Sequence, residues 1–326
     1  MGTPAAARTY PPVGTLVGRA RAGDPRAVAR LITMVESGHP SLPELAAALA
    51  PHTGSARVIG LTGAPGVGKS TVTSQLVGAF RAEGRRVGVL AVDPSSPYSG
   101  GAILGDRVRM QDHATDPGVY IRSMSSRGHL GGLAAATPQA VRVLDGAGCD
   151  VILVETVGVG QAEVEVVDLA DTTLVLLAPG MGDAIQAAKA GILEIADVFV
   201  VNKADRDGAD AAYHDLQGMI ALADRGPGDW RPRVVRAVAV RGQGVDEIMA
   251  AIDKHAAWLR THDRLRDRRE RRAAAEVEAI ALAEVRGRLA AAGGATALRQ
   301  LAAEVVAGAR DPYGAARALL ANLGWD

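Results

Sequence analysis

The sequence predicts a doubly wound α/β fold built on a mostly parallel sheet. Short apolar runs alternate with helical segments across residues 57–255, which is the pattern of this fold class. Several runs are apolar throughout, as expected for strands that are buried on both faces of a parallel sheet. Hydrophobic residues make up 48% of the chain and aromatic residues only 3%, so the core is expected to consist of aliphatic side chains.

Seven apolar runs are expected to form the strands of this sheet. In chain order they are RVIGLTG (57–63), RVGVLAVD (86–93), GVYIRS (118–123), DVILVET (150–156), TTLVLLA (172–178), DVFVVNK (197–203) and RVVRAVAV (233–240). Because the segments between them carry helical patterns, the strands are expected to run parallel, with their carboxyl ends at one edge of the sheet.

Helical patterns flank the strand region on both sides. The first 55 residues are helical in pattern, and Asp24 followed by Pro25 predicts an N-cap and a first helical residue. Residues 245–290 are expected to form one long helix, because apolar residues recur there at roughly helical spacing. The predicted domains are an N-terminal helical segment (1–55), an α/β domain (56–255), and a C-terminal helical arm with a hairpin (256–326).

Charge and composition exclude several classes of protein. Lys+Arg and Asp+Glu both number 36, so the net charge favours neither nucleic acid nor an anionic membrane as a partner. Cys149 is the one cysteine, which excludes an internal disulfide framework. No apolar run approaches the roughly 20 residues of a membrane span, and the N-terminus does not resemble a signal peptide. A cytoplasmic location is therefore expected.

A phosphate-binding loop is predicted after the first strand. Residues 63–70, GAPGVGKS, match GxxxxGK[ST] in full between a strand-like and a helix-like run. Lys69 is expected to contact the β- and γ-phosphates, and the Ser70 hydroxyl to be a Mg²⁺ ligand. The alternative is a glycine-rich turn with an unrelated lysine. The candidate nucleotide-binding residues are Gly63, Ala64, Pro65, Gly66, Val67, Gly68, Lys69, Ser70 and Thr71.

A second motif indicates which base the nucleotide carries. Asn202, Lys203 and Asp205 form NKxD at the end of a strand. A carboxylate can accept both the N1–H and the 2-amino group of guanine, whereas adenine lacks that edge, so GTP and GDP are the expected ligands. A further guanine contact usually comes from a Ser-Ala pair, and here Val238, Ala239 and Val240 occupy that place. Their backbone N–H groups remain candidates for the guanine oxygen.

Acidic residues at strand ends predict the metal site and the catalytic centre. Glu155 ends a buried run and Gly158 follows it, in the place of the usual DxxG motif that serves Mg²⁺ and the γ-phosphate. Asp93 begins a Gly/Ser/Pro-rich loop that also contains Asp106 and is interpreted as a switch loop. The candidate catalytic residues are Lys69, Asp93, Asp106 and Glu155. The alternatives are a helix-capping role for Glu155 and a merely solvated loop for the aspartates.

With these residues placed, the chain resembles the MeaB/ArgK family, P-loop GTPases of the SIMIBI class that are associated with methylmalonyl-CoA mutase. The resemblance covers nearly the whole chain and departs at Val238. Its motifs stand in the order GAPGVGKST, VLAVDPSSPYSGGAILGDRVRM, RGHLGG, VETVGVGQ, NKAD and DPYGAARALL. The order is more specific than any one of these motifs.

The resemblance implies a function that the motifs alone do not. Family members act as chaperones of an adenosylcobalamin-dependent methylmalonyl-CoA mutase, use GTP hydrolysis to gate cofactor loading and release of damaged cofactor, and are typically homodimers joined through the C-terminal arm. The resemblance also implies a further switch in residues 179–191, PGMGDAIQAAKAG. Asp183, Gln186 and Lys189 are its candidate residues for coupling to the partner.

Three alternative functions remain open at this point. A metal-delivery GTPase of the hydrogenase or urease type needs His or Cys clusters, and one cysteine with seven scattered histidines offers no evident cluster. A kinase for a small molecule or protein is disfavoured by the guanine motif. A nucleotide-regulated binding protein with negligible turnover is the third alternative, which a measurement of phosphate release would distinguish.

Overall fold

The structure is a computed structural model of the whole chain. It describes residues 11–93, 111–113, 115–125, 136–156, 168–180, 193–223, 225–226, 228–291 and 294–321. The chain divides into two compact units, Met1–Arg268 and Arg269–Asp326, which are described separately below.

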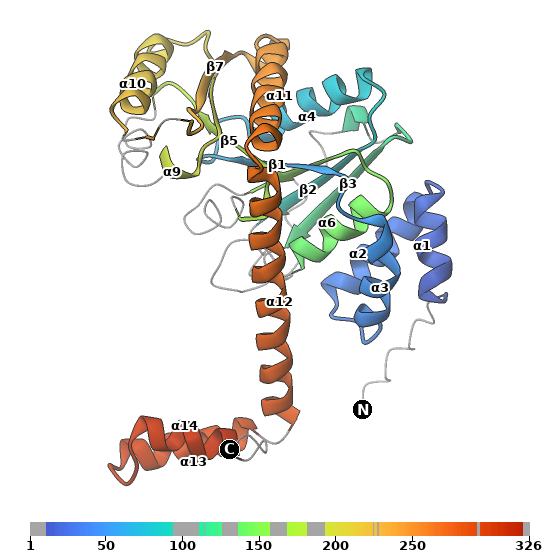
Figure 1. Cartoon of the computed structure of the whole chain (residues 1–326), viewed down its shortest axis with the longest axis vertical. Coiled ribbons are helices and arrows are strands. Elements are labelled where there is room, and N and C mark those ends of the chain that lie inside the picture. The colour runs from blue at the N-terminus through green and yellow to red at the C-terminus, as the bar shows by residue number, and fades with distance from the viewer. Residues whose placement is uncertain are drawn as a thin grey trace. The chain divides into compact units, whose positions relative to one another are not determined.

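The first unit contains a seven-stranded sheet in which every neighbouring pair of strands is parallel (Figure 1). The strands are β1 (Arg57–Thr62), β2 (Val87–Asp93), β3 (Val119–Ser125), β4 (Val151–Glu155), β5 (Thr172–Leu177), β6 (Val198–Asn202) and β7 (Arg233–Ala237). Their order across the sheet is β3-β2-β4-β1-β5-β6-β7. The doubly wound α/β fold predicted from the sequence is confirmed, and each predicted run contributes one strand.

Helices cover both faces of the sheet (Figure 1). Helix α4 (Lys69–Ala82) and α11 (Val245–Thr261) pack together on one face, whereas α6 (Thr137–Gly146) lies on the other. In β4, Ile152 and Val154 join the apolar cluster of the α6 face, and the intervening residues join the cluster of the α4 face. This alternation follows from the two-residue period of a strand, and it explains why the runs are apolar throughout.

Short helices complete the first unit. On the α6 face, α1 (Val13–Arg21), α2 (Pro25–Glu36) and α3 (Leu42–Leu49) form an N-terminal layer, and α10 (Ala209–Leu222) packs on β6 and β7. The remaining short elements are η1 (Ala50–His52), η2 (Gln111–His113), α9 (Leu193–Ile195) and η4 (Ala239–Arg241).

The predicted N-cap at Asp24 is confirmed. Its Oδ1 accepts hydrogen bonds from the backbone N–H groups of Arg26 (2.9 Å) and Ala27 (3.4 Å) at the start of α2. The hydrogen bond from the Arg19 side chain, followed by these backbone bonds, lowers the pKa of the Asp24 carboxyl. The ionised carboxylate therefore stabilises the first turn of α2.

The long helix predicted over residues 245–290 is instead two helices. Helix α11 ends at Thr261, and α12 runs over Arg264–Ala291. Between them Asp263 has a φ of 56°, in the left-handed region, which an α-helix cannot include. Aspartate tolerates this conformation better than most residues, so the apolar periodicity continues through a break that periodicity alone does not reveal.

The second unit contains the rest of α12, followed by α13 (Gly294–Val306) and α14 (Pro312–Ala321). Asp311 caps α14 by accepting from the N–H groups of Tyr313 (3.0 Å) and Gly314 (2.9 Å), and these bonds contribute to the lowered pKa of its carboxyl. Several large apolar side chains of this unit are exposed, namely Val277, Ile280, Leu282, Leu298, Val306, Tyr313 and Leu320.

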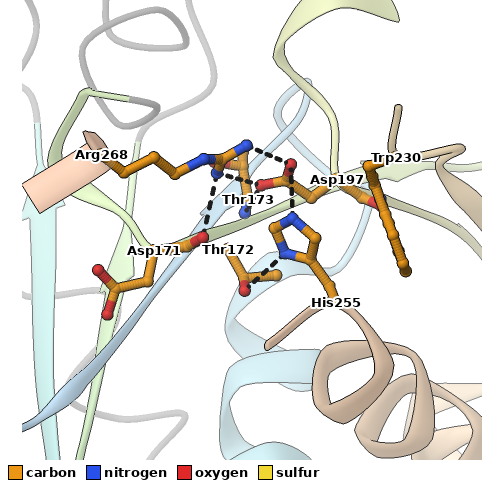
Figure 2. Close-up of polar contacts among 7 residues, drawn as sticks. All are labelled: Asp171, Thr172, Thr173, Asp197, Trp230, His255 and Arg268. Atoms are coloured by element: carbon orange, nitrogen blue, oxygen red, sulfur yellow. Dashed lines mark hydrogen bonds and ion pairs between the residues drawn. The ribbon is translucent and has the colours of Figure 1, made fainter. Parts of the chain in front are cut away.

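A buried polar cluster lies at the amino ends of β5 and β6, the edge opposite the carboxyl ends (Figure 2). Asp197 is its centre. The Asp197 carboxylate accepts two hydrogen bonds from the Arg268 guanidinium, at 2.8 and 2.7 Å, and one from the Thr173 N–H at 2.8 Å. The Trp230 indole N–H donates to the Asp197 carbonyl oxygen at 2.8 Å. We refer to these residues with His255 and Thr172 as the Asp197 cluster.

His255 in this cluster is held in its neutral form. Burial lowers the pKa of its imidazole to about 4, although the neighbouring Asp197 carboxylate acts in the opposite direction. Its Nδ1 lies 2.9 Å from the Thr172 hydroxyl oxygen. Because Arg268 already neutralises Asp197, the cluster does not require a second buried cation. The start of α12 is thereby fixed to the first unit.

Candidate active site

The loop between β1 and α4 has a backbone shape that depends on glycine. Gly63 and Gly68 have φ values of 140° and 97°. A Cβ at Gly63 would lie 2.3 Å from the carbonyl oxygen of Leu176 in β5, and a Cβ at Gly68 would lie 2.4 Å from Nδ2 of Asn202. Only glycine therefore allows the loop to pack this closely against the neighbouring strand ends.

Lys69 and Ser70 are the first two residues of α4, and both are buried. The Lys69 ammonium donates to the carbonyl oxygens of Gly63 (2.7 Å) and Ala64 (3.2 Å). The N-terminus of a 14-residue helix carries N–H groups without intrahelical partners, and its dipole favours an anion. The loop, the lysine and the helix end thus form a phosphate-binding arrangement.

Glu155 is the last residue of β4, and its side chain is only 4% exposed. Because β4 pairs with β1, with Glu155 opposite Leu61, the carboxylate lies beside the start of α4. Its Oε1 accepts a hydrogen bond from the Ser70 hydroxyl at 2.6 Å, and its Oε2 lies 3.2 Å from the Thr73 hydroxyl oxygen. The carboxylate therefore faces two hydroxyl groups of the same helix.

Thr73 was missed by the sequence analysis, because it lies beyond the end of the GxxxxGK[ST] pattern. A signal was present, since residues three apart in a helix share a face and Thr73 follows Ser70 by three positions. Recognising it required knowing that Glu155 lies against that face.

Asn202 joins three segments of the site. Its amide nitrogen donates to the carbonyl oxygen of Val67 (2.8 Å), and its amide oxygen accepts from the N–H of Ala239 (3.1 Å). Lys203 has a positive φ of 57° and donates to the carbonyl oxygen of Gly66 at 2.6 Å. The end of β6 thus positions both the phosphate-binding loop and the η4 turn.

Asp205 lies in the turn after β6, with a side chain that is 35% exposed. Arg241 of η4 places its Nη2 at 3.5 Å from one carboxylate oxygen of Asp205. Each carboxylate oxygen can accept more than one hydrogen bond, so this carboxylate can still accept from the edge of a base.

The residues proposed as a third guanine contact are arranged differently from a simple strand end. β7 stops at Ala237, and the chain then turns through η4. The Val238 N–H donates to the carbonyl oxygen of Gln243 at 3.0 Å, and the Ala239 N–H donates to Asn202. Both amides therefore already have acceptors within the protein, whereas Val240 is exposed.

The remaining predicted residues are only partly covered by the described residues. Asp93 ends β2, the strand next to β4, so its backbone lies at the same edge as Glu155, but its side chain is outside the described residues. Five further candidates also lie outside them, namely Asp106, Gly158, Asp183, Gln186 and Lys189.

The donor atoms of the site are suited to a hard cation. Ser70 and Glu155 offer a hydroxyl and a carboxylate oxygen within 2.6 Å of each other, and Mg²⁺ prefers such oxygens together with phosphates. Within the part of the chain that the structure describes, no group of three or more His, Cys, Asp or Glu residues could hold a metal ion. Cys149 is buried, and this burial raises the pKa of its thiol to about 12, which makes it a poor metal ligand.

These features define a P-loop GTPase fold: a phosphate-binding loop after the central strand, an acid on the neighbouring strand, and an NKxD turn beside the loop. The family model described as "Methylmalonyl Co-A mutase-associated GTPase MeaB" matches residues 28–294. The chain belongs to this family.

Relatives and a solved structure agree with this assignment. A protein of Pyrococcus abyssi that is named as a GTPase is 46% identical over 95% of this chain and 97% of its own. The GTPase ArgK of Escherichia coli is 39% identical over 77% of this chain and 78% of its own. A crystal structure titled as an LAO/AO transport system kinase has a TM-score of 0.72 and 28% identity, covering 98% of this chain and all of that one.

The helices were also compared with the requirements of a membrane span. Among the residues that the structure describes, no helix is both long enough and apolar enough to cross a membrane.

Proposed function

We propose that this chain binds GTP with Mg²⁺ and hydrolyses it to GDP and phosphate. The observation that carries the proposal is the contact between Glu155 and Ser70 at the start of α4, directly beside the Lys69 loop. A buried carboxylate that is hydrogen-bonded to the hydroxyl of GK[ST] provides the oxygen pair that Mg²⁺ and phosphates require. The family name and the relatives named as GTPases support the same activity.

Each part of the site has a task in this proposal. Lys69 exchanges its bonds to the carbonyl oxygens of Gly63 and Ala64 for bonds to phosphate oxygens. Ser70 and Glu155 hold the metal side of the phosphates, with Asp93 and Asp106 as further candidates. When bound, Mg²⁺ neutralises charge that develops on the phosphates. Asp205 accepts the N1–H and 2-amino group of guanine.

Base selectivity tests the nucleotide proposal. Asp205→Asn should weaken GTP binding by about 1 to 3 kcal/mol, because guanine's two donors lose their shared carboxylate. The same variant should prefer xanthosine triphosphate, in which a carbonyl replaces the 2-amino group and can accept from the new amide. Calorimetric titration with GTP, ATP and xanthosine triphosphate measures this. A wild-type protein that binds ATP as tightly as GTP would contradict the proposal.

The family's association suggests the purpose of hydrolysis. We infer that GTP turnover by this chain gates adenosylcobalamin loading into methylmalonyl-CoA mutase, and protects or reactivates that enzyme. The support is the family description, which names the mutase. A cytoplasmic location, with no nucleic-acid or membrane partner, belongs to the same proposal.

Stimulation by the mutase tests this finer function. Gln161 follows Gly158 by three residues rather than directly, so intrinsic turnover should be slow, and a docked partner should raise it. Alanine at Gln186 or Lys189 should leave the isolated rate unchanged and suppress the stimulated rate, as phosphate release would show. A mutase that leaves the wild-type rate unchanged would remove it as the partner.

A homodimer joined through the second unit is also proposed. Its support is the set of exposed apolar side chains on α12 to α14, since surfaces of this kind are commonly covered by a second copy. In the full-length chain, Val277→Asp together with Ile280→Asp should convert a dimer into a monomer in light scattering. Leu222→Asp, at an exposed apolar residue of α10, is the matched control and should remain dimeric. A monomeric wild-type protein at micromolar concentration would refute the dimer.

The alternative functions can be separated by the same measurements. The kinase title of the similar solved structure keeps a phosphotransferase reading open, which predicts phosphate transfer to an acceptor rather than release to water. A metal-delivery role needs soft ligands, and the buried, high-pKa thiol of Cys149 is a poor candidate for one.

A further inference from the structure

The carboxylate of Glu155 is held at both of its oxygens by one helix. Ser70 donates to Oε1 at 2.6 Å, and the Thr73 hydroxyl oxygen lies 3.2 Å from Oε2. All three side chains are buried, and Thr73 is 0% exposed. The arrangement therefore excludes bulk water from the contact.

The Thr73 hydroxyl has a choice of two acceptors. It lies 3.0 Å from the backbone carbonyl oxygen of Lys69, one turn earlier, as well as near Glu155. A hydroxyl carries a single hydrogen, and an ionised carboxylate is a stronger acceptor than a peptide carbonyl that already belongs to a helix. The bond to Glu155 is therefore the more favourable use of that hydrogen.

A second contact matters more for glutamate than for a shorter acid. Glutamate has one more methylene group than aspartate, and its last torsion angle is broad rather than fixed in one rotamer. A carboxylate held at one oxygen can rotate about that torsion, so its second oxygen is not positioned. A donor on each oxygen removes this freedom.

We infer that Thr73 is a positioning residue for the metal site. Its hydroxyl holds Oε2 of Glu155, so that Oε1 stays directed at the Ser70 hydroxyl, which is the oxygen pair expected to serve Mg²⁺. The inference rests on the proposed function, because it concerns the same Mg²⁺-nucleotide site.

The test compares variants of the full-length chain. Thr73→Val keeps the branched shape and removes the hydroxyl, whereas Thr73→Ser keeps the hydroxyl and removes a methyl group. Thr137→Val is the matched control, because Thr137 is a buried threonine of α6 whose hydroxyl makes no hydrogen bond in the described part of the chain. Binding of a fluorescently labelled GDP is measured in excess EDTA and in Mg²⁺, and thermal melting checks the fold.

The expected result separates the metal from the nucleotide. In EDTA all variants should bind GDP like wild type, because the Lys69 loop is unchanged. The factor by which Mg²⁺ tightens binding should be about three- to tenfold smaller in Thr73→Val, on the scale of one net hydrogen bond, and nearly normal in Thr73→Ser and Thr137→Val. If Thr73→Val does not fold, Thr73→Ala must show the same reduction.

Two outcomes would overturn the inference. Unchanged Mg²⁺ tightening in Thr73→Val would show that the second oxygen needs no donor, and an equal loss in Thr73→Ser would show that the methyl group matters rather than the hydroxyl. A wild-type protein that binds no GDP, or whose binding ignores Mg²⁺, would instead contradict the proposed function and remove the Thr73 inference with it.

Discussion

Replacement of Lys69 by alanine should weaken binding of GTP and GDP at least about 100-fold. A charge-assisted hydrogen bond contributes about 1.5 to 3 kcal/mol, and the buried Lys69 ammonium can make such bonds to two phosphates. The loss should be similar in EDTA and in Mg²⁺, because the lysine acts on the phosphates directly. Equilibrium titration with labelled nucleotide measures it.

The fold should survive this change. Lys69→Ala removes a donor from the carbonyl oxygens of Gly63 and Ala64, but it also removes a buried charge, and alanine is a good residue at the start of a helix interior. Lys254→Ala, which removes the same charge from an exposed position of α11, is the control and should bind normally. Nucleotide affinity within tenfold of wild type in Lys69→Ala would show that the loop does not bind phosphate.

Replacement of Glu155 by glutamine should lower GTP turnover by about 10² to 10³, the scale for losing one preorganised electrostatic group at a reacting phosphate. Glutamine keeps the size of the side chain, and its amide oxygen can still accept from the Ser70 hydroxyl. The negative charge is lost, however, so the tightening of nucleotide binding by Mg²⁺ should fall as well. Phosphate release and binding in EDTA distinguish these two effects.

The Glu155 variant also separates chemistry from affinity. In EDTA, GDP should bind to Glu155→Gln as it binds to wild type, which is the opposite of the result for Lys69→Ala. Asp145→Asn is a comparison variant, because Asp145 is another buried acid, in α6, that accepts from the loop before β1 rather than at the site. It should lower stability and leave the Mg²⁺ dependence unchanged. Equal turnover in Glu155→Gln and wild type would exclude Glu155 from the reaction.

The sheet could be predicted because its signal is local. Runs such as VILVE in β4 are apolar on both faces, and each is bounded by residues that end a strand. The break between α11 and α12 could not be predicted in the same way. It depends on the backbone of Asp263, and the apolar spacing on either side is compatible with a continuous helix.

The site was predictable where a motif fixes the geometry and not where packing does. Lys69, Ser70 and Asn202 lie together because the loop and β6 meet at one edge of the sheet. Thr73 belongs to no motif, and its role depends on β4 lying next to β1, which is a property of strand order. The amide partners of Val238 and Ala239 likewise depend on the η4 turn rather than on the residues themselves.

The Asp197 cluster gives this chain an internal optical probe. Aromatic residues are scarce, yet Trp230 and Trp258 lie 5.7 Å apart between ring centroids, and both flank His255. They are the two tryptophans among the described residues; Trp325 lies outside them. Intrinsic indole emission from this pair therefore reports on the amino ends of β5 and β6 and on the start of α12. Any change of that emission on adding nucleotide would record a signal that had crossed the full width of the sheet.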